Sequence, residues 1–260
     1  MADPLLITLL PSADVDLGRW LLSHYEISYT ERPHAPIFHV LALKSWGVGA
    51  DDYPLFVRGG DKFGGIEKLL PELEAAAPAA LKLLPDPDQN PAQYKQVDEL
   101  QHYARWKMGS DVVNWSYWNL LKYKSVVWPS ITTQVPVYEK LTCLVAFRVV
   151  RALMYRGLKL DQSVANASLD RIHQGWDKFD ALLSDGREYL VGDRLSFADL
   201  ALATSGGPMI LAQGYHGMLP NHALCPVFMQ QTYQEFRQRP TGRFIQRIYD
   251  QYRLPQLLCV

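Results

Sequence analysis

Apolar runs and helix-spaced apolar positions alternate along residues 1–76. The first run, LLITLL, ends at Pro11 and is typical of a short buried strand. After it, apolar side chains recur three and four positions apart, as on one face of a helix. The pattern predicts strands at 5–10, 27–30 and 55–57 and helices at 17–25 and 64–70. This alternation predicts a small α/β layer.

The pattern changes after this layer. Residues 71–97 contain five prolines, which is typical of a linker. Long stretches with helix-spaced apolar positions follow at 92–122, 136–158, 162–184, 196–214 and 226–252. Few strand-like runs occur among them, so the second part is predicted to be a helical bundle. We therefore expect an α/β domain at 1–76, a linker at 77–95 and an all-helical domain at 96–260.

An ionisable residue stands at the start of one of these helices, in the stretch YLVGDRLSFADLALA at 189–203. The hydroxyl of Ser196 can accept from the amide of Asp199, and the Asp199 carboxylate can accept from the amide of Ser196. Leu195 and Leu200 stand at the positions of a hydrophobic staple around this capping box. The stretch therefore predicts the N-terminus of a buried helix, a feature that occurs in many folds.

Composition and charge exclude several classes of partner. Of the 260 residues 48% are hydrophobic, and 26 lysines and arginines balance 27 acidic residues. Because neither sign dominates, nucleic acid, an anionic membrane and polyanionic substrates are not expected as partners. The most apolar internal run, 141–154, contains Arg148 and Arg151 and is shorter than a membrane span, so no membrane insertion is expected.

The first residues and the cysteines favour a cytoplasmic location. The start, MADPLLITLL, has no basic segment and becomes polar after ten residues, unlike a secretory signal. Cys143, Cys225 and Cys259 are odd in number and far apart, with no C-x-x-C pair and no ligand-like histidine spacing. Neither a disulfide framework nor a metal site is therefore expected.

An α/β layer followed by helices, with the capping box late in the chain, resembles the glutathione transferase superfamily. The stretches that carry the resemblance are GRWLLSHYEISYTE, HAPIFH, YPLFV and LLSDGREYLVGDRLSFADL. HAPIFH is similar to a bacterial subgroup of mostly uncharacterised members. The resemblance implies an α/β plus all-α fold, with a thioredoxin-like N-terminal domain followed by a transferase-type helical bundle, and a homodimer.

Ser12 is the residue that the resemblance assigns to catalysis. Glutathione transfer needs a thiolate, and a free thiol has a pKa of about 8.5. A hydroxyl and helix N-terminal amides beside the sulfur both favour the thiolate. Ser12 follows the first strand, where many relatives have serine or cysteine, but it can equally be a helix N-cap without catalysis. Val15 stands where the bacterial subgroup usually has cysteine, which disfavours cysteine-dependent redox chemistry.

The rest of the expected glutathione site follows from the resemblance. Tyr53 and Pro54 are expected to form a cis bond whose preceding backbone holds the cysteinyl part of the ligand. His34 is a candidate for the glycyl end. Relatives have a serine before the third helix, whereas this chain has Lys62-Phe63-Gly64-Gly65. The amides of Gly64 and Gly65 could still bind the γ-glutamyl carboxylate with Asp61 near its amine, or the site has decayed.

Aromatic residues early in the helical half are candidates for the second-substrate pocket. The aromatic-rich segment contains Tyr103, Trp106, Trp115, Tyr117 and Trp118; Tyr103, Trp106 and Trp115 are taken as pocket residues, and Trp106 is the one expected to reach the pocket. An aromatic surface would suit an apolar ligand, although aromatic residues at helical spacing also pack into cores.

The leading hypothesis is a cytoplasmic, dimeric glutathione transferase-like protein that presents the thiol of reduced glutathione to a small apolar electrophile. One alternative is a non-catalytic ligand carrier or scaffold with a degenerate glutathione site. Another is a glutathione-independent isomerase or cyclase that acts on a bulky apolar metabolite.

Overall fold

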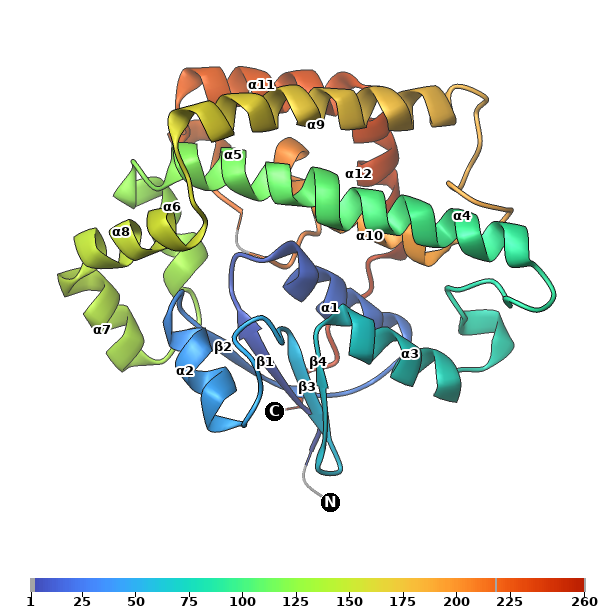
Figure 1. The fold of residues 1–260 in the computed structure, drawn as a ribbon, viewed down its shortest axis with the longest axis horizontal. Helices are drawn as coiled ribbons and strands as arrows, with labels where there is room; N and C mark the ends of the chain where they lie inside the picture. Colours follow the sequence, from blue (N-terminus) through green and yellow to red (C-terminus); the bar gives the residue numbers. More distant parts are fainter. Residues whose placement is uncertain (1–2, 218, 260) are drawn as a thin grey trace.

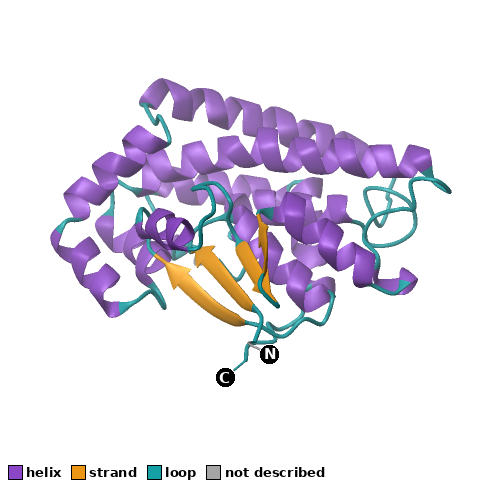
Figure 2. Ribbon diagram, turned by 60° about the horizontal axis from the view of Figure 1, so that its bottom comes forward, coloured by secondary structure: helices purple, strands orange, loops and turns teal. Residues whose placement is uncertain are grey.

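The computed structural model describes residues 3–217 and 219–259. A small sheet with its helices forms one side of the molecule, and long helices form the other (Figure 1). Figure 2 shows the strands side by side beneath the long helices. One apolar core runs through both parts, from Leu6 and Trp20 in the first to Trp176 and Tyr249 in the second.

The N-terminal part contains the predicted strands and helices in their order, and it also has a helix at 38–45 and a strand at 61–64 that lie outside the predicted ranges. Its elements are β1 Leu5–Leu9, α1 Ala13–His24, β2 Thr30–His34, α2 Phe38–Ser45, β3 Leu55–Arg58, β4 Asp61–Gly64 and α3 Ile66–Ala76. The strand order is β2-β1-β3-β4, with β1 parallel to β2 and the other two pairs antiparallel. This is the thioredoxin-like arrangement expected from the resemblance.

The second strand begins later than predicted. It was expected at 27–30, whereas β2 begins at Thr30 and includes Pro33. Proline is accommodated because β2 is an edge strand with only β1 beside it. Tyr29 instead pairs with the C-terminal tail: its N–H donates to the Leu257 carbonyl at 3.0 Å, and its carbonyl accepts from Cys259 at 2.9 Å.

The remaining elements are helical. After a 3₁₀ turn at Ala79–Leu81 they are α4 Pro91–His102, a π-helical segment Tyr103–Gly109, α5 Ser110–Leu120, α6 Lys124–Thr132, α7 Val137–Val145, α8 Phe147–Gly157, α9 Gln162–Leu183, α10 Phe197–Ile210, a 3₁₀ turn His222–Leu224, α11 Val227–Gln238 and α12 Pro240–Tyr252. The π-helical segment joins α4 to α5, so the predicted helix at 92–122 is nearly continuous.

In the helical part, two of the predicted helices are each broken into two, and helix α6 was not predicted. The stretch 136–158 breaks at Ala146, between α7 and α8. The stretch 226–252 breaks before Pro240, because proline lacks an N–H and clashes with the preceding turn, whereas it fits the first position of a new helix. Helix α6 contains Pro129, which hid its helical pattern.

Helix α10 is the central buried helix, and the capping box stands at its start. The Asp199 carboxylate accepts from the Ser196 N–H at 2.8 Å, the Ser196 hydroxyl at 2.7 Å and the Leu190 N–H at 2.8 Å. Burial raises the pKa of Asp199 to about 6, and these hydrogen bonds oppose that rise. The carboxylate therefore fixes both the helix start and the loop before it.

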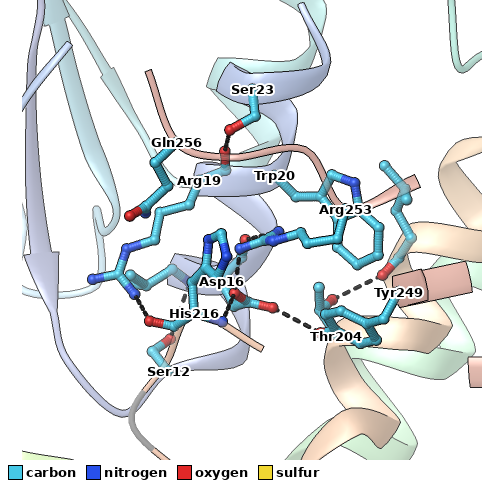
Figure 3. Close-up of polar contacts among 12 residues, drawn as sticks. Ser12, Asp16, Arg19, Trp20, Ser23, Thr204, His216, Tyr249, Arg253 and Gln256 are labelled. Carbon is cyan, nitrogen blue, oxygen red and sulfur yellow. Dashed lines mark hydrogen bonds and ion pairs between the residues drawn. The ribbon is translucent and has the colours of Figure 1, made fainter. Parts of the chain in front are cut away.

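A buried carboxylate, that of Asp16 on α1, connects the two parts of the molecule (Figure 3). Asp16 is fully buried and accepts from Arg253 Nη2 at 2.6 Å, the Tyr249 hydroxyl at 2.7 Å and the His216 N–H at 2.9 Å. The Arg253 guanidinium also lies 4.7 Å from the centre of the Trp20 ring. One carboxylate thus joins α1 to α12 and to the loop that follows α10.

Arg19 extends this cluster to the sheet. Its Nη1 donates to the His216 carbonyl at 2.7 Å, and its Nε donates to Glu31 of β2 at 3.0 Å. The Thr8 hydroxyl of β1 donates to the same carboxylate at 2.7 Å. Helix α1, which follows Ser12, is therefore held from the sheet and from the helical part.

The position of His216 predicts a dependence of stability on pH. Burial, and then the positive charge of Arg253, lower the pKa of His216 to about 4 from an unfolded value of 6.5. Between these two values only the unfolded chain takes up the proton, so this residue lowers the free energy of unfolding as the pH falls from 6.5 to 4. Urea melts between pH 6.5 and pH 4 should show a smaller decrease in the free energy of unfolding for His216→Gln than for the wild type.

The variant must be compared with the wild type because Asp199 acts in the opposite direction. Its raised pKa increases the free energy of unfolding as the pH falls, over an overlapping pH range. The side chain of His216 can be changed safely, since its contacts with Asp16 and Arg19 use its backbone. His102→Gln, at an exposed position on α4, is the matched control and should follow the wild-type curve. Parallel curves for His216→Gln and wild type would contradict the prediction.

Candidate functional site

Ser12 lies between β1 and α1 and is the N-cap of α1. Its backbone is extended, with φ −131° and ψ 132°, and its hydroxyl oxygen accepts from the Val15 N–H at 3.4 Å. Within the described residues, no acceptor is found for the hydroxyl proton of Ser12. The residue therefore caps the helix and can still donate a hydrogen bond to a ligand above the helix N-terminus.

A cavity of about 470 Å³ opens over Ser12. Its walls come from the β1–α1 loop, α2, the loop before β3, α5 and α8, and they include Ser12, His39, Tyr53, Tyr117, Leu153 and Met154. Most of the exposed lining is apolar. A cavity of this size can hold a small organic ligand or a peptide of a few residues.

The peptide bond between Tyr53 and Pro54 is cis, as expected. Tyr53 borders the cavity and precedes the paired residues of β3, so the sheet does not use its main chain. Pro54 also packs against α1, where a Cβ on Gly18 would come within 2.8 Å of the proline ring. Glycine at position 18 is therefore what lets α1 lie close to this loop.

The N-terminus of α3 carries an ion pair in place of the missing serine. Gly65 caps α3 with φ 76°, which favours glycine. In the first turn, Glu67 pairs with Arg105 at 2.8 Å, and Arg105 also contacts Asp14 of α1 at 3.0 Å. The Arg105 side chain is only 4% exposed. An acidic ligand at Gly65 would compete with Glu67 for the helix terminus and for Arg105.

Asp61 does not lie near Gly65. It stands opposite Arg58 at the hairpin end of β4, whereas Gly64, at the other end, lies opposite Leu55 beside the cis bond. Three residues of strand separate the two ends by roughly 10 Å. A ligand amine bound at Gly65 would therefore lie far from Asp61, so the role expected for this residue has no support in this geometry.

His34 is engaged with α7 instead of the cavity. Its Nδ1 lies 2.7 Å from Oε1 of Glu139, and the other carboxylate oxygen accepts from the Ala35 N–H at 2.8 Å. Glu139 is fully buried. His34 therefore fixes α7 to the end of β2, and the role expected for it at the glycyl end of glutathione has no support in this geometry.

The three aromatic candidates lie on other faces of their helices than the cavity. Tyr103 and Trp115 pack into the core, edge-on to Phe179 at 5.9 Å and Tyr233 at 5.8 Å between ring centres. Trp106 is 50% exposed and lies beside Arg105. The face of α5 that borders the cavity carries Val113 and Tyr117, which belongs to the same aromatic segment; both positions are about half a turn away from Trp115.

A second, smaller cavity of about 80 Å³ adjoins the first and is almost wholly apolar. Both cavities are bordered by Pro11, Val113 and Tyr117. The Tyr117 hydroxyl donates to the Pro11 carbonyl at 2.7 Å, so the Tyr117 ring separates them. The inner cavity can take a small apolar group of a ligand that is bound over Ser12.

His39 is a cavity residue that sequence reasoning did not select. Its ring is edge-on to Tyr53, with 5.5 Å between centres, and burial lowers its pKa, so the imidazole is neutral at neutral pH. Within the described residues its buried Nδ1 has no hydrogen-bond partner. Only its place in HAPIFH, after the second strand, could have indicated it.

Across 3–217 and 219–259, no three His, Cys, Asp or Glu side chains are arranged to hold a metal ion. Over the same residues, no helix has both the length and the apolar character needed to cross a bilayer.

Comparisons with known proteins agree with this architecture. Residues 161–226 match the family model described as the glutathione S-transferase C-terminal domain. The comparison with curated proteins gives no match. Among solved structures, the chain is similar to a glutathione S-transferase from Sinorhizobium meliloti 1021, with 20% identity over 94% of this chain and 92% of that one and a TM-score of 0.53.

Two further solved structures show the same fold. Glutathione transferase GSTFuA3 from Phanerochaete chrysosporium has 12% identity and a TM-score of 0.62, over 98% of this chain and 99% of that one. A glutathione S-transferase from Methylobacillus flagellatus KT, solved with GSH bound, has 14% identity and a TM-score of 0.51, over 94% and 98%. The chain therefore has the two-part fold of the glutathione S-transferases, and its segment 161–226 matches the C-terminal domain model of that family.

Proposed function

We propose that the protein is an enzyme that binds reduced glutathione in the Ser12 cavity and presents its thiol to a small apolar electrophile. The observation that carries the proposal is the position of Ser12, a helix N-cap with a free hydroxyl proton at the base of a cavity of about 470 Å³. The similar protein from Methylobacillus flagellatus KT, which was solved with GSH bound, supports the choice of ligand.

The chemistry follows from the groups around the sulfur. The Ser12 hydroxyl donates to the sulfur, and the N-terminal amides of α1 favour its negative charge. The thiol proton passes to solvent or to the neutral imidazole of His39. The sulfur then forms a bond to an electrophilic carbon, and the displaced electron pair leaves with a leaving group or moves along a polarised double bond. The inner apolar cavity behind Tyr117 holds the hydrophobic end of the electrophile.

The proposal also covers the setting of this reaction. We take 1–76 as the glutathione-site domain, 77–95 as the linker and 96–260 as the domain that contacts the second substrate. The cytoplasm is the proposed location, supported by three free cysteines, since thiols stay reduced there. A homodimer is proposed by analogy with the superfamily.

Ser12→Ala tests the proposed reaction. We expect it to lower turnover with an aryl halide and glutathione by about ten- to a hundredfold, because one hydrogen bond to a charged sulfur is lost. The dissociation constant of glutathione, measured by calorimetry, should change much less, since the main chain and α3 hold the tripeptide. Saturable heat at millimolar glutathione is the first requirement, and its absence would overturn the proposal.

A control separates catalysis from helix capping. Ser12→Asp keeps an N-cap acceptor for the Val15 amide but replaces the hydroxyl donor by an anion. It should preserve the melting temperature and still lose turnover. Wild-type turnover in Ser12→Ala would show that Ser12 is only a cap.

One observation favours a second candidate function, a ligand carrier without glutathione chemistry. At the terminus of α3, where the γ-glutamyl carboxylate would bind, Arg105 already forms ion pairs with Glu67 and Asp14. An apolar dye that binds the cavity and is not displaced by glutathione would support the carrier.

A further inference from the structure

Helix α7 presents an apolar face to solvent. Its exposed positions are Val137, Tyr138, Leu141, Leu144 and Val145, with exposed fractions of 73%, 62%, 55%, 51% and 89%. These positions lie on one side of the helix, opposite Glu139 and Cys143, which are buried. A surface helix ordinarily shows the reverse pattern, so this face indicates a contact with an apolar medium or partner.

Helix α8 continues this surface. Val149 and Leu153 are 58% and 47% exposed, whereas Phe147, Val150 and Met154 on its other side are buried. Figure 1 shows α7 and α8 together at the left edge of the molecule, apart from the long helices. We call the exposed residues of these two helices the α7–α8 face.

Helices α7 and α8 are held to the rest of the protein by contacts on their buried side. Glu139 of α7 is bound to His34 and to the Ala35 N–H, and Cys143 lies in an apolar cluster with Phe147 and Val150. The hairpin therefore has its own buried side, and its exposed apolar side is a second face.

Positive charge surrounds the α7–α8 face. The segment 136–159 contains five basic residues, Lys140, Arg148, Arg151, Arg156 and Lys159, of which all but Arg151 are exposed. Its single acidic residue, Glu139, is buried. The whole chain has a net charge of −1, so the rest of the molecule is acidic and this segment is distinctly basic.

The sign of this charge argues against a second copy of the chain as the occupant. A two-fold interface brings the same patch of both subunits together. Here that would place five cations of one copy opposite five of the other, with no exposed acidic residue in the segment between them. The face is complementary instead to a surface that is both apolar and anionic.

We propose that the α7–α8 face docks the protein onto the surface of an anionic lipid bilayer. Aliphatic side chains of α7 and α8 enter the boundary between headgroups and acyl chains, and the flanking arginines and lysines contact acidic headgroups. The helices lie on the membrane and do not cross it. The docking requires neither glutathione nor catalysis.

The docked orientation would bring the Ser12 cavity to the membrane. Leu153 of the α7–α8 face, together with neighbouring Leu158 and Leu41, lines the mouth of that cavity. Leu41 on α2 is itself 61% exposed. An apolar ligand dissolved in the bilayer would therefore reach the cavity along a continuous apolar path.

Vesicle flotation tests the docking with the full chain. The wild type should float with vesicles of phosphatidylcholine mixed with phosphatidylglycerol and bind phosphatidylcholine alone at least about tenfold more weakly, with binding reduced by salt. Leu141→Glu/Val145→Glu should lower the affinity for the mixed vesicles by at least about tenfold, because two carboxylates would enter the interface. Arg148→Glu/Arg156→Glu should remove the preference for anionic lipid.

The control is Val227→Glu, an equally drastic change at a position on α11 that is 68% exposed and lies outside the α7–α8 face. It should bind as the wild type does, and all variants should keep the wild-type melting temperature. Absence of wild-type flotation with anionic vesicles, or equal losses for Val227→Glu and Leu141→Glu/Val145→Glu, would overturn the proposal.

Two further outcomes would assign the face to another occupant and so overturn the proposal. A dimer in light scattering that Leu141→Glu/Val145→Glu dissociates, without vesicle binding, would identify a second copy. Binding to soluble polyglutamate as tight as to vesicles would identify an acidic protein partner. Loss of flotation would leave glutathione binding unchanged, so this test is separate from that of the proposed function.

Discussion

Asp16→Ala is expected to lower the free energy of unfolding by about 3–5 kcal/mol, because it leaves a buried arginine without its partner. Arg253 is 3% exposed in its side chain and holds Asp16 at 2.6 Å. The substitution also removes the acceptor of the Tyr249 hydroxyl and of the His216 N–H. Urea denaturation followed by tryptophan fluorescence measures the loss.

Two comparisons make this result interpretable. Asp98→Ala, at an exposed position on α4, should change the free energy of unfolding by less than about 0.5 kcal/mol. Asp16→Leu combined with Arg253→Met should recover much of the loss, since no unpaired charge then remains buried. If Asp16→Ala were as stable as Asp98→Ala, the ionic cluster would not hold the two parts of the molecule together.

Asp199→Ala is expected to lower the free energy of unfolding by about 2–4 kcal/mol. The substitution leaves the buried N–H groups of Leu190 and Ser196 without an acceptor, and each such group costs about 1–3 kcal/mol. The loss should appear in denaturant melts and as faster amide hydrogen exchange at the start of α10.

Ser196→Ala is the matched change at the same helix start. It removes the hydroxyl that donates to the carboxylate but keeps both main-chain hydrogen bonds to Asp199, so a loss of about 1 kcal/mol is expected. An Asp199→Ala loss no larger than that of Ser196→Ala would show that water readily replaces the carboxylate.

The layers of the fold were predictable because they depend on local patterns. The capping box of α10 and the α/β order both come from residues a few positions apart. The misplacement of the second strand has a nonlocal cause, since Tyr29 pairs with residues 257–259. The missed break before Pro240 is different, because proline at that position was a local signal of a helix start.

The candidate site was predictable only in part. Ser12 was visible as a helix cap after a strand. Arg105 and Glu139 were not, because their partners Asp14 and His34 lie 91 and 105 residues away in the chain. The basic character of segment 136–159 was overlooked because only the net charge of the whole chain, −1, was considered. The acidic residues elsewhere in the chain offset the basic residues of this segment.

The contact between Asp16 and Arg253 spans 237 positions of the chain. At a synthesis rate of about 5–20 residues per second, Arg253 is made roughly 12–47 s after Asp16. During that interval the nascent α1 carries a carboxylate that its later partner has yet to neutralise, beside a Trp20 ring still open to water. Helix α1 therefore reaches its final packing only after translation has passed α12.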